Sequence, residues 1–291
     1  MAADQAYRRP VLLDHHLLLL VTVGHGTHEV DFRTHPCRPG TLIWARPGQV
    51  VRYGGQPGLD AIVVCWDGAA LAELDTSGAS TAAFGPAYWQ LAGEDEDAVI
   101  NEVSQLVVDC QRHRSGERAA DLLRHQLAVL LLRLALLPAA ERYPAGAPGP
   151  GPGGTEPALG TFHRLREEVE RSYGRTRRVE DYAERLRCSV RTLTRACLAV
   201  TGRSGKQVID DRVTLQAMRL LAATDAPIAD IGRRLGFPEP TNFGRFFHRE
   251  VGQSPGAFRA GLGSGGRQRL PEQRGPVRPA AFTPFEGGPL P

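Results

Sequence analysis

Polar side chains suited to DNA recognition occupy matching segments of the C-terminal half of the chain, arginine and threonine in both segments and asparagine in the second. The first segment covers residues 189–195, and the second covers residues 239–245, 50 residues later. Arginine can form two hydrogen bonds to guanine, and asparagine can form two to adenine, in the major groove of DNA. Both segments therefore carry the residue types that recognise base edges.

Each segment is expected to form a helix that buries one side and presents its polar residues on the other. If Ser189 caps the first helix, Leu193 and Cys197 face the core. The residues expected to contact DNA are Ser189, Arg191, Thr192, Thr194, Arg195, Arg203, Lys206, Thr241, Asn242, Arg245 and Arg249. For Arg195 and Arg245, a phosphate contact or an ion pair within the domain is the alternative to base recognition.

A short helical pattern precedes each segment, so that helix, tight turn and second helix occur twice. Asp181 matches Asp230 at a spacing of 49 residues, whereas the second helices match at a spacing of 50. The second turn is therefore one residue longer. Small residues at Ala183 and Gly232 allow the two helices of each pair to cross closely. This outline predicts two helix-turn-helix units in tandem.

The stretch between the two units is expected to be one long helix. Residues 204–224 contain no proline and, after Gly205, no glycine, and their apolar residues recur at three- and four-residue steps. About 20 helical residues span roughly 30 Å, close to the distance of about 34 Å between successive major grooves on one face of DNA. The helix could place two recognition helices in adjacent grooves, or it could simply be the core helix of an all-helical domain.

Residues of about 160–261 resemble the DNA-binding domain of the AraC/XylS family of bacterial transcription regulators. The resemblance rests on four stretches, residues 228–237, 242–247, 252–255 and 258–259. Two stretches, 196–197 and 203–206, depart from the family's pattern and leave the fine sequence preference open. The resemblance implies a sequence-specific transcription regulator whose partners are double-stranded DNA and, if it is an activator, RNA polymerase.

The distribution of charge supports a DNA-binding C-terminal domain. Residues 1–158 carry a net charge of −6, residues 159–261 carry +7 and the remainder carries +2, in a chain with +3 overall. A basic domain is suited to the phosphate contacts that dominate affinity for DNA.

The N-terminal part is expected to form a small β-barrel or sandwich. Short runs rich in Val, Leu, Thr and aromatic residues are separated by glycine and proline turns. These runs are residues 17–23, 27–32, 41–45, 50–53 and 61–66. Residues of about 10–90, including the turn at 46–50, also resemble the cupin-like sensor domain that precedes the DNA-binding domain in many family members.

Four residues of the β-region could be considered as metal ligands. They are His25, His28, Glu29 and His35. His25 and His28 are three residues apart, so on a strand they point to opposite faces, and neither a metal nor another cofactor is expected. A pocket for a small-molecule effector is favoured instead, and a purely structural barrel that supports dimerisation is the alternative.

Two helical stretches follow, at residues 97–112 and 118–137. The second has leucines that step by four, three, four and three residues, which is an a/d pattern over two heptads. These leucines are Leu123, Leu127, Leu130, Leu134 and Leu137. They are expected to join two copies of the chain into a homodimer, as a helix of this kind does in sensor-bearing members of the family. Burial of the helix within its own domain is the alternative.

The composition predicts a multi-domain protein. Residues 1–137 form a cupin-like sensor and dimerisation domain with a small β-barrel and helices, and residues 138–158 form a linker rich in proline and glycine. Residues 159–261 form an all-α domain with two helix-turn-helix units. Residues 262–291 are expected to be a disordered tail.

A cytoplasmic regulator without enzymatic activity fits these observations best. Five cysteines lack metal-binding spacing, which is typical of a reduced cytosolic protein. The apolar run at 17–23 is too short to span a bilayer, so no membrane partner is expected. Two rivals would carry the same DNA-binding domain. One is a cupin-type enzyme, and the other is an alkyl-transfer DNA repair protein, which would need four zinc-binding cysteines beside an acceptor thiol.

Overall fold

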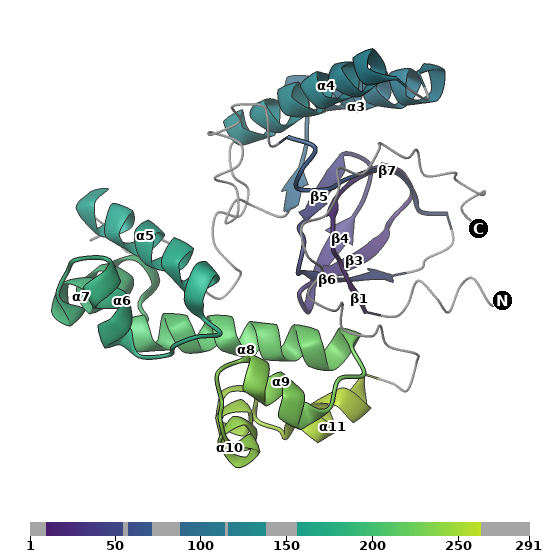
Figure 1. The fold of residues 1–291 in the computed structure, drawn as a ribbon. Helices are drawn as coiled ribbons and strands as arrows, with labels where there is room; N and C mark the ends of the chain where they lie inside the picture. The colour runs from purple at the N-terminus through teal and green to yellow at the C-terminus, as the bar shows by residue number, and fades with distance from the viewer. Residues whose placement is uncertain (1–9, 55–57, 72–87, 114–115, 138–155, 263–291) are drawn as a thin grey trace. The chain divides into compact units, whose positions relative to one another are not determined.

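The computed structural model describes residues 10–54, 58–71, 88–113, 116–137 and 156–262. The chain divides into two compact units (Figure 1), and the described residues up to 137 belong to the first and those from 156 onward to the second. Nearly all of the expected linker and tail lies outside the described residues. The first unit is rich in β-sheet and the second is built from helices, which confirms the predicted fold class.

Two four-stranded antiparallel sheets form the β-structure of the first unit. Their orders are β1-β6-β3-β4 and β7-β2-β5-β8. The strands are β1 (Val11–Leu12), β2 (His16–Val23), β3 (Gly26–Val30), β4 (Arg33–Cys37), β5 (Thr41–Ala45), β6 (Val50–Gly54), β7 (Asp60–Trp66) and β8 (Tyr88–Gln90). All five predicted strands are present with small shifts at their ends, whereas β1, β4 and β8 were not predicted.

Strand β2 is apolar along nearly its whole length because it separates two cores. Leu18 and Leu20 pack in a cluster with residues of two helices. Leu17, Leu19 and Val21 pack in a second cluster that contains residues of both sheets. A strand that is buried on both faces needs a continuous apolar run, and for this reason it is evident in the sequence.

The hairpin between β3 and β4 corrects one predicted strand. The sequence favours a strand through Phe32, but the chain reverses at Asp31 and Phe32, whose φ angles are 50° and 65°. The Asp31 carboxylate accepts hydrogen bonds from the Gln49 side chain at 2.6 Å and from the Val50 amide at 3.1 Å. These bonds hold a turn whose residues lack the usual glycine. Strand β4 lies at a sheet edge, where Pro36 is tolerated because no partner needs its missing N–H.

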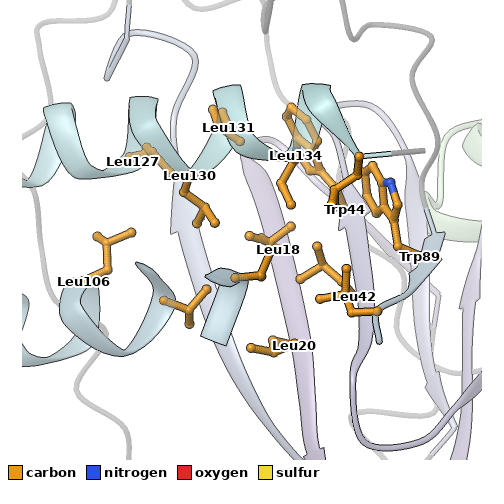
Figure 2. Packing of buried hydrophobic residues seen from close by; sticks show 14 of the residues in the cluster. Leu18, Leu20, Leu42, Trp44, Trp89, Leu106, Leu127, Leu130, Leu131 and Leu134 are labelled. Carbon is orange, nitrogen blue, oxygen red and sulfur yellow. The ribbon is translucent and has the colours of Figure 1, made fainter. Parts of the chain in front are cut away.

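Helices α3 (Glu94–Arg112) and α4 (Glu117–Leu136) pack on the sheet β7-β2-β5-β8. Figure 2 shows Leu130 and Leu134 of α4 directed toward Leu18 of the sheet. Both helices were predicted. Helix α3 begins three residues earlier than expected, and α4 begins one residue earlier. Among the helices in the described ranges, none has the length and apolar composition needed to cross a lipid bilayer.

The packing of α4 corrects the predicted dimerisation residues. Leu123, Leu127, Leu130, Leu134 and Leu137 all lie in the core of their own domain and are at most 9% exposed. A second chain could reach them only if α4 left the sheet. The heptad spacing is real, but the sheet occupies this face of the helix. A different set of α4 residues is exposed, namely Leu122, Val129, Leu132 and Leu136.

The second unit consists of helices joined by short turns. They are α5 (Glu156–Ser172), α6 (Val179–Arg185), α7 (Val190–Thr201), α8 (Gly205–Ala223), α9 (Ile228–Arg234), α10 (Pro240–Val251) and α11 (Pro255–Gly261). Helix α5 begins at Glu156, within the stretch assigned to the linker. Pro157 is tolerated in its first turn because the N–H that proline lacks would have no helical partner there. Gly202 and Gly252 end α7 and α10 in the left-handed conformation.

Candidate DNA-binding site

The two helix-turn-helix units share one long helix. Helix α8 has α6 and α7 beside its first turns and α11 beside its last turns (Figure 1). Ser204 and Gln207 form a capping box that fixes where α8 begins. The helix is 19 residues long, or about 28 Å at 1.5 Å per residue. The predicted helix of residues 204–224 is thereby confirmed.

The crossing of α9 and α10 depends on Gly232. A Cβ atom at this position would lie 3.0 Å from Cβ of Phe243, closer than side chains normally approach. This confirms the expected close crossing of the second pair. In the two turns, Arg187 and Gly236 occupy matching places with φ angles of 51° and 77°. The first helix-turn-helix pair therefore makes the same left-handed turn with Arg187, whose side chain is exposed to solvent.

Helix α7 begins as predicted. The Ser189 hydroxyl accepts a hydrogen bond from the Thr192 amide at 3.0 Å and lies 2.8 Å from the Thr192 hydroxyl. Leu193 and Cys197 are fully buried. Arg191 and Arg195 are exposed, one turn apart, on the opposite side of the helix. Ser189 and Thr192 thus fix the helix start, and the two arginines extend from it.

Both arginines of α7 are free to bind a ligand. Within the described residues, neither Arg191 nor Arg195 has an ion-pair or hydrogen-bond partner. Thr194 lies between them and is half-buried. The alternative of an ion pair for Arg195 within the domain is therefore not observed in this part of the chain.

Two apolar residues of the exposed side of α7 were not identified from the sequence. Leu198 is 51% exposed and Val190 is 36% exposed. Leu198 lies seven residues after Arg191, so the two share a face. An exposed leucine there could contact the methyl group of thymine. The helical spacing from Arg191 was the available signal, but a leucine in a helix is usually assigned to the core.

Helix α10 has the same division of faces. Phe243, Phe246 and Phe247 anchor it in the core, and the rings of Phe243 and Phe247 lie 6.0 Å apart. Thr241, Asn242 and Arg245 are exposed. No side-chain hydrogen bond or ion pair to another described residue engages these three. They therefore present one donor-rich surface.

The other three expected DNA contacts already have acidic partners. Arg203 donates to Asp211 at 2.8 Å. Lys206 pairs with Asp210, and Arg249 lies 3.6 Å from Asp210 and 2.7 Å from Glu250. The three basic side chains are exposed, and the Arg203–Asp211 pair, exposed on both sides, is of the weak kind that can open, whereas Asp210 is itself buried. Their charge is nonetheless partly neutralised within the domain.

Arg177 connects the two helix-turn-helix pairs of the C-terminal unit by a second route besides α8. It precedes α6, and its guanidinium carbon lies 3.5 Å above the centre of the Phe237 ring and 5.6 Å from that of Phe246. Phe237 follows α9, and Phe246 belongs to α10. Burial lowers the pKa of Arg177 from its ordinary value, which fits a cation packed on aromatic rings. This contact connects the segment before α6, in the first helix-turn-helix pair, to the α9–α10 pair.

Replacing Arg177 with alanine is expected to destabilise the C-terminal unit. A partly desolvated cation–π contact contributes about 1–2 kcal/mol, so the free energy of unfolding should fall by that amount in urea titrations followed by circular dichroism. Arg178→Ala is the matched control, because Arg178 is exposed and its nearest carboxylate, on Glu180, is 3.7 Å away. Equal effects of the two variants would show that the stacking contributes nothing.

The candidate metal ligands of the first unit do not converge. His28 is buried, whereas His25 is exposed in a turn and Glu29 pairs with Arg52. Only His35 lies opposite His28, as its cross-strand neighbour. In the described ranges, no group of three or more His, Cys, Asp or Glu residues could hold a metal ion.

His28 is nevertheless unusual, because it is a buried polar residue of β3 with an unsatisfied ring nitrogen. Its Nε2 atom is buried without a hydrogen-bond partner, and its ring meets that of Tyr53 edge-on at 4.7 Å. Burial, and secondarily His35, lowers the pKa of His28 to about 4. The ring is therefore neutral at neutral pH and retains unused hydrogen-bonding capacity.

The five cysteines are free thiols at separate places. Burial raises the pKa of Cys197 to about 12, so this thiol stays protonated and is a poor nucleophile. The cysteines do not form the four-ligand cluster that an alkyl-transfer repair protein would need.

Comparison with known proteins identifies both parts of the chain. A family model described as a helix-turn-helix domain matches residues 182–261. A second model, described as an AraC-like ligand binding domain, matches residues 1–128.

Relatives with curated names are transcriptional activators. HTH-type transcriptional activator RhaR of Klebsiella pneumoniae is 27% identical over 248 residues, covering 83% of this chain and 84% of that protein. HTH-type transcriptional activator RhaS of Yersinia pseudotuberculosis is 23% identical over 177 residues, covering 61% and 60%. The solved DNA-binding domain of AdpA, a global transcriptional factor in complex with a target DNA, is 30% identical. That match covers 37% of this chain and 93% of that one, with a TM-score of 0.32.

Proposed function

We propose that this chain, which belongs to the AraC family of DNA-binding transcription regulators, places α7 and α10 in successive major grooves of one duplex. The observation that carries the proposal is the pair of exposed polar surfaces, on α7 and on α10, whose arginines have no partner among the described residues. Helix α8, at about 28 Å by its rise per residue, is near the groove spacing of about 34 Å, so slight bending of the DNA would complete the fit.

Each recognition helix has its own chemistry. Arg191 and Arg195 of α7 suit guanine, with Thr194 between them and Leu198 available to a thymine methyl group. On α10, Arg245 suits guanine and Asn242 suits adenine, and Thr241 stands beside them at the helix start.

Phosphate contacts are assigned to the residues that surround the two helices. Ser189 and Thr192 lie at the start of α7, where backbone N–H groups also favour an anion. Arg203, Lys206 and Arg249 are the cationic candidates, and they would exchange their carboxylate partners for phosphates. Because each exchange breaks an existing ion pair, these three should contribute less to affinity than an unpaired arginine.

Dimerisation is proposed through the exposed stripe of α4, which consists of Leu122, Val129, Leu132 and Leu136. These residues step by seven, three and four positions, the spacing of a coiled-coil seam. Leu136 is 86% exposed and Leu132 is 45% exposed. Apolar side chains aligned in this way on a soluble helix are typical of a surface that is covered by a partner. A second copy of the chain supplies the same stripe.

The first unit is proposed to bind a small-molecule effector, in agreement with the ligand-binding description of its family model. The unpaired nitrogen of His28 between the sheets supports this role, because a ligand could satisfy it. We further propose that the protein acts in the cytoplasm as an activator that contacts RNA polymerase, without enzymatic activity. The names of the relatives support activation.

Selection of DNA by the full-length protein from a random pool tests the proposal. The retained fragments should contain two short conserved blocks whose centres lie about one helical turn, 10–10.5 base pairs, apart. A dimer should yield two such pairs. Fragments with a single block would show that only one helix reads bases, and fragments without conserved blocks would refute sequence-specific reading.

A further inference from the structure

Three side chains form a row across one end of the sheet β7-β2-β5-β8. His16 of β2 is directly opposite Trp66 of β7. Arg46 follows Ala45, which pairs with Leu17, so Arg46 occupies the next place in register beside His16. Strand residues two apart share a face, so this row faces the same side as Leu18 and Trp44. That side is covered by α3 and α4.

The three side chains of the row and the neighbouring Trp44 contact one another closely. The Arg46 guanidinium carbon lies 4.5 Å from the centre of the Trp44 ring. Trp44 Nε1 donates a hydrogen bond to His16 Nδ1 at 3.2 Å. The His16 ring stacks on Trp66, with centroids 5.0 Å apart and planes 6° from parallel. Because Nδ1 accepts, the neutral His16 ring carries its proton on Nε2, which remains available as a donor.

Arg46 is a half-buried cation for which the described residues supply no counterion. Its Nη2 atom is inaccessible to solvent and has no hydrogen-bond partner. No carboxylate of the described residues pairs with it. Burial lowers the pKa of Arg46 to about 10, and no neighbouring acid opposes this effect. Placing a charged nitrogen out of reach of solvent is costly unless a partner compensates it, and stacking on Trp44 leaves the N–H groups of Nη2 unused.

We propose that this row is a binding site for the carboxylate of a small apolar or aromatic acid. Arg46 and the Nε2–H of His16 would donate to the carboxylate oxygens, and charge-assisted bonds of this kind are stronger than neutral ones. The parts of the Trp44 and Trp66 rings that Arg46 and His16 leave uncovered would contact the apolar part of the acid. A carboxylate fits better than a phosphate, because few donors converge here and a dianion would require more.

The site lies under the end of the helix proposed for dimerisation. Leu134 and Leu137 pack in the same cluster as Trp44 and Trp66, and Figure 2 shows Leu134 beside Trp44 and Trp89. A bound acid would therefore stiffen the last turns of α4, whose outer side carries Leu132 and Leu136. This regulatory consequence rests on the proposed dimer, whereas binding of the acid does not.

The three tryptophans of the chain report directly on this site, because Trp44, Trp66 and Trp89 all belong to the one cluster. The full-length protein would be titrated with hexanoate, phenylacetate or inorganic phosphate at constant ionic strength. Tryptophan emission and thermal unfolding would be followed. We expect a saturable emission change and a rise in Tm with the two organic acids, at millimolar concentrations or below, and neither change with phosphate.

Arg46→Met is the decisive variant, with Arg38→Met at the other end of β5 as its matched control. Arg38 is exposed, so its loss should leave the response intact. Arg46→Met should abolish the response and leave the ligand-free protein at least as stable as the wild type, because an uncompensated charge is replaced by an apolar chain. No response of the wild type to either acid, or an equal response of Arg46→Met, would overturn the proposal.

A second measurement separates the site from its regulatory role. Sedimentation and binding to the selected DNA would be compared with and without hexanoate or phenylacetate. Emission changes without any effect on assembly or DNA affinity would preserve the site and reject its link to the dimer. An effect on DNA affinity that persists unchanged in Arg46→Met would place the effector elsewhere and reject this site.

Discussion

Leu130→Asp is expected to unfold the N-terminal unit, whereas Leu132→Asp, two residues further along α4, is expected to leave it folded and to separate the dimer. Leu130 is 0% exposed, and Leu132 is 45% exposed. Truncation of a buried leucine alone costs about 2–5 kcal/mol, and burial of an unpaired carboxylate adds to this. The total approaches the whole stability of a typical domain, about 5–15 kcal/mol.

The two variants can be separated by two measurements on the full-length protein. Tryptophan emission reports on the fold of the N-terminal unit, because Trp44, Trp66 and Trp89 all lie in its core, and sedimentation velocity reports on assembly. Val63→Asp, on β7 at 42% exposure, is a control for an added surface charge. A native emission spectrum for Leu130→Asp would contradict the packing of α4, and a dimeric Leu132→Asp would exclude the proposed stripe.

In helix α4 the periodicity of the leucines does not determine which of them are buried. It has two stripes with coiled-coil spacing, one through Leu130 and one through Leu132. Spacing predicts a stripe but does not say what covers it. Here the sheet covers the first stripe, and this could not be known before the orientation of α4 on strands β2 and β5 was known. The stripe through Leu130 is the richer in leucine, and a leucine-rich stripe suits a domain core as well as a dimer seam.

The helix-turn-helix region was predicted more completely because its signals are local. Caps such as Ser189, close crossings such as that at Gly232 and the alternation of buried and exposed faces depend on neighbours within a few turns. Arg46 is the opposite case. In the sequence it is a turn residue two places after Trp44 and before a proline, and only the pairing of β2 with both β5 and β7 brings His16 and Trp66 to these two residues.

Arg191→Ala and Arg245→Ala are expected to weaken binding to the selected DNA by about 1–3 kcal/mol each, which corresponds to roughly 5- to 150-fold. Each side chain is exposed and has no partner among the described residues, so its loss breaks no contact within the domain and should leave stability unchanged. The change should be confined to affinity and sequence preference. Electrophoretic mobility or fluorescence anisotropy at one fixed salt concentration would measure it, because phosphate contacts make affinity salt-dependent.

The two losses should map to different parts of the operator. With Arg191→Ala, preference should relax only in the block read by α7, and with Arg245→Ala only in the block read by α10, as repeat selections with each variant would reveal. Arg249→Ala is the matched control from the same helix as Arg245. Because Arg249 already lies near Asp210 and Glu250, its loss should lower affinity less and by similar factors on selected and random DNA. If Arg245→Ala behaved in this second way, Arg245 would be a phosphate contact, and base reading by α10 would depend on Thr241 and Asn242 alone.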